Sequence, residues 1–145
     1  MEPTKIYIIC PVRKITEHEK KVILTYAQTL ERDHNSVVRV PFRDTDQNDE
    51  LGLRIIQEHE DDIIWAEEIH VWWNATSEGS LWDFAQTRMA MRFMPEKKVH
   101  LVNIDEVDVT DQKSYTNVVL ATYLRLTSDS TLDELKEKMR ARWVS

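Results

Sequence analysis

Short apolar runs alternate with longer amphipathic stretches along the chain. Runs rich in β-branched and aromatic residues, each bounded by proline or polar turns, are typical of buried strands. The predicted strands are 5–10, 37–40, 69–73 and 98–104. Elsewhere apolar residues recur at the spacing of one helix face. The predicted helices are about 16–33, 51–66, 81–94, 114–126 and 131–143, with a strand at 117–121 as an alternative within the fourth.

Strands that alternate with helices predict an α/β protein with a parallel sheet covered on both faces. Ligands of such sheets bind beyond the carboxyl ends of the strands, where the strand order reverses. If the first strand lies between the second and the third, the reversal falls between the first and the third. The loops 11–14 and 74–83 then face the predicted binding crevice.

Composition narrows the function classes. A chain of 145 residues with 41% hydrophobic residues predicts a single domain, residues 1–145, with its own core. The net charge of -7 argues against duplex nucleic acid as a partner. No apolar run approaches the roughly 20 residues that span a bilayer, and the start of the chain lacks the pattern of a signal peptide. We therefore expect no membrane partner and a cytoplasmic location.

The loop 77–83 is the first candidate for chemistry. Gly79 allows a tight turn or the close approach of a ligand, and Ser80 begins the predicted helix, whose free amides attract anions. Asp83 lies one turn further on, on the same side as Ser80. Two interpretations remain open: Asp83 completes a capping box with Ser80, or it is a catalytic carboxylate facing the crevice.

Other polar groups are less specific. Arg13 follows the first strand and could hold an anion, or could be a solvated surface residue. The run 58–62 places a histidine among four carboxylates, but no second histidine lies at a helical ligand spacing, so we expect a solvated acidic face and no metal site. His70 and His100 fall in strands and are expected to be core or edge residues. No dinucleotide, phosphate-loop or zinc-protease motif occurs, and no cofactor is expected.

Three segments in matching order, 6–13, 64–73 and 77–85, resemble motifs of one enzyme family. They read IYIICPVR, IWAEEIHVWW and SEGSLWDFA. They are similar to the opening strand, the third-strand segment and the S-x-G-T-x-x-E-L-G signature of nucleoside 2-deoxyribosyltransferases and the related 2'-deoxynucleoside 5'-monophosphate N-glycosidases. The resemblance covers about residues 5 to 104.

The resemblance implies a flavodoxin-like three-layer sandwich with a mostly parallel sheet of four or five strands. It also implies a homodimer or larger homo-oligomer that cleaves or exchanges the N-glycosidic bond of a (deoxy)nucleoside or nucleotide. Asp83 falls at the nucleophile and Tyr7 at the tyrosine that hydrogen-bonds it, while Glu60 or Asp62 falls at the acid that protonates the leaving base. The implied substrate-binding residues are Pro11, Val12, Arg13, Asn74, Ser77, Gly79, Ser80 and Trp82, with Arg13 and Ser80 near a 5'-phosphate.

The chain departs from the family signature at Asp83, where the family has glutamate, and at Ala85, where it has glycine. The shorter side chain sets the carboxylate back by about 1 Å, which is a distance that matters for catalysis. The alternative function is therefore a nucleotide-binding module of the same fold that does not turn its ligand over. Among the five tryptophans, Trp65 and Trp82 could stack on a base or, like the others, pack in a core or an interface.

Overall fold

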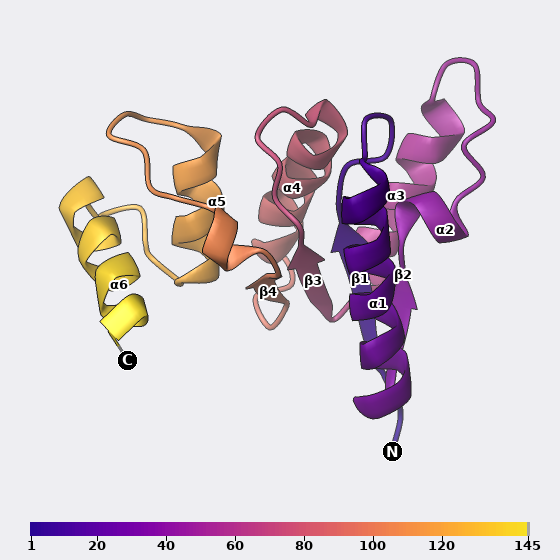
Figure 1. Ribbon diagram of the computed structural model, residues 1–145, viewed down its shortest axis with the longest axis horizontal. Helices are drawn as coiled ribbons and strands as arrows, with labels where there is room; N and C mark the ends of the chain where they lie inside the picture. Colours follow the sequence, from indigo (N-terminus) through magenta and orange to yellow (C-terminus); the bar gives the residue numbers. More distant parts are fainter. Residues whose placement is uncertain (145) are drawn as a thin grey trace. The chain divides into compact units, whose positions relative to one another are not determined.

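The computed structural model describes the backbone of residues 1–144 and the side chains of residues 1–142 (Figure 1). The chain forms two compact units, residues 1–102 and residues from 103 onward, and each is described by itself. None of the helices in the described part of the chain has the length and apolar character needed to cross a membrane.

The first unit is built on a sheet of four parallel strands, as the alternation of strands and helices predicts. The strands are β1 (Thr4–Ile9), β2 (Ser36–Arg39), β3 (Glu68–Val71) and β4 (Lys98–Leu101). Their order is β2-β1-β3-β4, which corresponds to the first four strands of the flavodoxin-like order. The first strand thus lies between the second and the third, and the expected reversal of strand order falls between β1 and β3.

Helices cover both faces of this sheet, so the predicted three layers are confirmed (Figure 1). Ile6 and Ile8 point from β1 toward α1 (Glu17–Asp33), where they pack with Ile23 and Ala27. Alternate residues of a strand face opposite sides, so Tyr7 faces the other layer. That layer consists of α3 (Leu53–Trp65) and α4 (Glu78–Met91), which contact each other and β1.

Several local predictions for the first unit are wrong, among them the extent of the fourth strand, which was expected to reach residue 104 and ends at Leu101. The loop expected after β2 begins with a short helix, α2 (Pro41–Asp44), because proline fits the first position of a helix. The strand expected to reach residue 73 ends at Val71. Trp72 and Trp73 nevertheless remain buried, and the N–H of Trp72 still donates to the carbonyl of Ile9 at 2.8 Å. The loops that follow β1 and β3 therefore start side by side.

The second unit contains a 3₁₀ turn (Ile104–Glu106), α5 (Tyr115–Tyr123) and α6 (Leu132–Val144). Residues 117–121 are helical, so the alternative of a strand there is wrong; the hydroxyl of Ser114 caps α5 by accepting from the N–H of Asn117. Leu135 and Met139 of α6 are buried, as its periodicity predicts. The predicted inward position of Trp143 lies outside the described side chains.

Candidate active site

The helix that holds Asp83 begins earlier than the sequence suggests. Ser77 is its N-cap, and the Ser77 hydroxyl accepts from the N–H of Ser80 at 3.2 Å. The Ser80 hydroxyl is itself buried and accepts from Ser77 Oγ at 2.9 Å. The Ser80 amide therefore already has a capping partner, and the interpretation of Ser80 and Asp83 as a capping box is wrong.

Asp83 instead points at the sheet. The Tyr7 hydroxyl donates to Asp83 Oδ2 at 2.8 Å, and the two residues are 0% and 4% exposed. Burial, followed by the neighbouring Asp83 carboxylate, raises the pKa of Tyr7 well above its ordinary value, so the phenol keeps its proton and acts as the donor. The structure thus brings together the two residues, 76 positions apart, that the resemblance pairs.

His59 is the third member of this cluster, although it was expected on a solvated face of its helix. Its Nδ1 lies 3.2 Å from Asp83 Oδ2, and its ring lies 6.0 Å from the Tyr7 ring between centroids. The Nε2 atom of His59 is buried and has no hydrogen-bond partner within the described part of the chain. A buried polar atom without a hydrogen-bond partner is unusual, and a catalytic role or a bound water or ion are among its explanations.

The prediction that residues 58–62 form a solvated acidic face is wrong for His59 and Asp62, which are both buried on α3. The signal was available, because Ile56, His59 and Ile63 are three and four residues apart and so share one helix face. A histidine inside an apolar stripe is placed toward the core by that stripe.

Of the two predicted acids, Asp62 has the more specific surroundings. It forms an ion pair with Arg39 of β2, and burial raises its pKa although Arg39 pulls in the opposite direction. The Arg39 guanidinium also stacks over the Trp65 ring at 4.2 Å. Glu60 is half-exposed, and the structure gives it no hydrogen bond or ion pair with the described residues.

A surface hollow of about 410 Å³ adjoins Asp62 at the β2 side of the sheet. Arg39, Thr45, Glu58 and Asp61 contribute to its lining. The hollow combines one guanidinium with several carboxylates, so it is a polar surface beside the buried cluster.

The predicted substrate-binding residues have mixed positions. Arg13 and Trp82 are exposed, Trp82 by 52%, and are free to meet a ligand. Asn74 is engaged within its own loop, where its Oδ1 accepts from the Thr76 N–H and hydroxyl at 2.9 and 2.7 Å. Pro11 is buried and Val12 and Ser77 are half-buried.

Gly79 does not form the tight turn that the sequence suggested, and the close approach of a ligand there stays a prediction. It lies inside the first turn of α4 with no positive φ, and a Cβ added there would meet no atom within 4 Å. Neither a tight turn nor a close approach within the protein therefore requires glycine at this position.

The four tryptophans whose side chains the structure describes divide between core and surface. Trp72 donates from Nε1 to Glu19 Oε2 at 3.0 Å, and Trp73 meets Phe84 edge to face at 6.1 Å between centroids. These two therefore pack internally. Trp65 is half-buried beneath Arg39, which leaves Trp82 as the exposed tryptophan nearest to Asp83 in the sequence.

The chain was compared with protein-family models and with curated proteins, and neither comparison found a match. The geometry of Tyr7, His59 and Asp83 therefore carries the functional interpretation, together with the resemblance of the motifs that contain Tyr7 and Asp83.

Proposed function

We propose that this protein cleaves or exchanges the N-glycosidic bond of a (deoxy)nucleoside or nucleotide, with Asp83 as the nucleophile. The observation that supports this proposal most directly is the orientation of the Asp83 carboxylate. Both of its contacts with described residues, from Tyr7 and from His59, engage Oδ2. Oδ1 is thus left as the oxygen for a substrate, on a side chain whose direction is fixed.

The proposed reaction follows the logic of retaining glycosidases. Asp83 Oδ1 attacks the anomeric carbon, the bond from that carbon to the base nitrogen breaks, and the electron pair leaves with the base. An acid protonates the departing base. Asp62 suits this role better than Glu60, because burial raises its pKa. A raised pKa increases the fraction of the carboxyl groups that carry the proton to be donated. Water, which gives a proton to the now ionised Asp62, or a second base then attacks the anomeric carbon and breaks its bond to Asp83. The product is the free sugar with water and an exchanged nucleoside with the base.

One feature of the site constrains this chemistry. The Asp83 side chain is only 5% exposed, so a sugar reaches Oδ1 only after neighbouring side chains move aside. The same feature favours the second candidate function, a module that binds a nucleotide above the cluster without turning it over. Transfer, hydrolysis and simple binding therefore make different predictions for the same ligands.

The deciding experiment incubates the protein with the common deoxynucleosides and their 5'-monophosphates, with and without a second free base. We expect chromatography to detect a released base or an exchanged nucleoside. Asp83→Asn should reduce the rate by about 1,000-fold or more, as expected for loss of a nucleophile. Asp129→Asn is the matched control, because it removes a carboxylate from an exposed position in the turn between α5 and α6 and should leave the rate unchanged.

The outcomes separate the two candidates. Product formation that persists in Asp83→Asn would reject Asp83 as the nucleophile. Absence of product with every base would reject the enzyme, and a rise in melting temperature with a nucleotide but no product would then support the binding module.

The homodimer or larger homo-oligomer and the cytoplasmic location belong to this proposal, since the resemblance and the composition suggest them. Light scattering coupled to size-exclusion chromatography tests the assembly state. A monomer at micromolar concentration would contradict it.

A further inference from the structure

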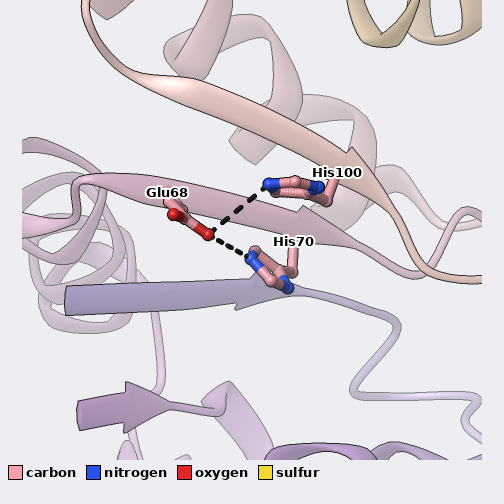
Figure 2. A group of neighbouring side chains, drawn as sticks. All are labelled: Glu68, His70 and His100. Carbon is pink, nitrogen blue, oxygen red and sulfur yellow. Dashed lines mark hydrogen bonds and ion pairs between the residues drawn. The ribbon is translucent and has the colours of Figure 1, made fainter. Parts of the chain in front are cut away.

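A second polar cluster lies on the opposite face of the sheet from Tyr7. Glu68 and His70 come from β3 and His100 comes from β4, and Figure 2 shows their side chains converging. The strand register explains the convergence. Glu68 and His70 are two residues apart and so share a face, while His70 and His100 are register partners on neighbouring parallel strands.

The distances in this cluster suit a small cation. His70 Nε2 lies 2.9 Å and His100 Nε2 lies 3.5 Å from the same oxygen, Glu68 Oε1. One donor atom from each of the three residues lies within 4.8 Å of the other two. Ligand atoms bound at 2.0–2.1 Å to a tetrahedral Zn²⁺ are about 3.3 Å apart. The two Glu68 contacts need shifts of only some tenths of an ångström to reach this separation. The two histidine nitrogens need a larger shift if they lie as far apart as 4.8 Å.

His70 has the outer partner that metal-binding histidines usually have. Its Nδ1 is hydrogen-bonded to the Tyr26 hydroxyl of α1 at 2.6 Å. When the ring proton resides on Nδ1, this N–H donates a hydrogen bond to the Tyr26 oxygen. The lone pair of Nε2 then faces Glu68 and His100. Such a contact fixes the orientation of the ring, and because a hydroxyl can donate or accept, it is compatible with the tautomer that metal binding needs.

Exposure across the cluster is graded. The side chains of His70, Glu68 and His100 are 5%, 24% and 47% exposed. One ligand is therefore anchored in the protein, while another borders solvent and gives an ion an entry path. Two imidazoles with one carboxylate form a donor set that suits Zn²⁺ and related transition metals better than Mg²⁺ or Ca²⁺.

We propose that Glu68, His70 and His100 bind one divalent transition-metal ion of the Zn²⁺ type, with a coordination position left open toward solvent. The site is separate from the proposed nucleophile, since Tyr7 and His70 face opposite sides of the sheet. The sequence predicts no metal site when ligands are considered at helical spacing alone. These ligands are instead at strand spacing, two residues apart on one strand and opposite on the next.

The test titrates metal-free protein with ZnCl₂ by isothermal calorimetry and, in parallel, with CoCl₂ by visible absorption, which reports the coordination of the ion. We expect one ion per chain. His100→Gln should weaken the binding of Zn²⁺ by more than about 100-fold, because loss of a ligand should exceed the effect of losing an outer partner. His18→Gln is the matched control, because it removes an exposed histidine from α1 and should leave the affinity unchanged.

Tyr26→Phe distinguishes a built site from casual binding by surface histidines. It should lower the affinity for Zn²⁺ by about 10- to 100-fold and keep the ratio of one ion per chain, as expected for an outer partner. Circular dichroism of each metal-free variant shows whether it is folded, and Glu68→Gln replaces His100→Gln if that variant is not.

Two results would overturn the proposal. The first concerns the unaltered protein at metal concentrations up to about 100 μM. The proposal fails if calorimetry detects no binding of one Zn²⁺ per chain or if CoCl₂ produces no absorption spectrum of a bound ion. The second is Zn²⁺ binding that His100→Gln, or Glu68→Gln in its place, leaves as tight as before.

Discussion

The hydrogen bond from Tyr7 to Asp83 is the contact on which the proposed site depends most, and Tyr7→Phe removes it while keeping the ring. A hydrogen bond to a charged group contributes about 1.5–3 kcal/mol to stability. The two side chains are buried, and the Tyr7 hydroxyl oxygen lies 2.8 Å from Asp83 Oδ2, so water would not readily replace the lost donor. His59 Nδ1 remains 3.2 Å from the same oxygen and offsets part of the loss. We therefore expect the free energy of unfolding to fall by about 2 kcal/mol.

The assay is urea unfolding followed by tryptophan fluorescence, which the buried Trp72 and Trp73 make sensitive to the core of the first unit. A loss of about 2 kcal/mol moves the urea midpoint down by about 1 M for a protein of this size. Asp83→Leu and the double variant complete a cycle that isolates the pair, and the coupling free energy should be about 1.5–3 kcal/mol. If the proposed reaction occurs, Tyr7→Phe should also slow it by about 10- to 100-fold.

The assigned hydrogen bond would be contradicted by a Tyr7→Phe variant whose free energy of unfolding falls by less than about 0.5 kcal/mol and whose coupling free energy with Asp83 stays within that margin. The carboxylate would then be held by other groups. Tyr7 would then not be the group that orients the Asp83 carboxylate and leaves Oδ1 for a substrate.

Three further predictions concern the same unit. First, the stability of the protein should fall as the pH rises above about 10, because Tyr7 then loses its proton in the unfolded chain but keeps it in the folded protein; pH-dependent urea unfolding should show this slope reduced in Tyr7→Phe. Second, Arg39→Met should destabilise the protein by about 2 kcal/mol, between the values for exposed and buried ion pairs, because it leaves the Asp62 carboxylate buried without its partner, and adding Asp62→Asn should restore part of the loss. Third, Ser77→Ala should lower the free energy of unfolding by about 1 kcal/mol by removing the N-cap of α4, whereas a loss of less than about 0.2 kcal/mol would contradict the assigned cap.

The order and type of the main elements follow from local patterns along the chain. Apolar runs of the β-branched type specify strands such as 5–10, and the 3.6-residue spacing of apolar positions specifies helices such as α1. These patterns are local, and burial of one face rewards them wherever the element lies in the fold. The parallel α/β architecture follows from the alternation, since parallel strands need crossover connections.

Which polar side chains contact one another depends on the tertiary structure. Tyr7 and Asp83 are joined across 76 positions, and His59 reaches them from a third element, so no spacing in the chain could reveal the group. The same holds for Glu68 and His100, which the register of two strands places together. Hydrophobic burial specifies which face of an element turns inward, but the contacts between polar groups depend on how elements pack and on the alignment of their residues, and both are properties of the assembled fold.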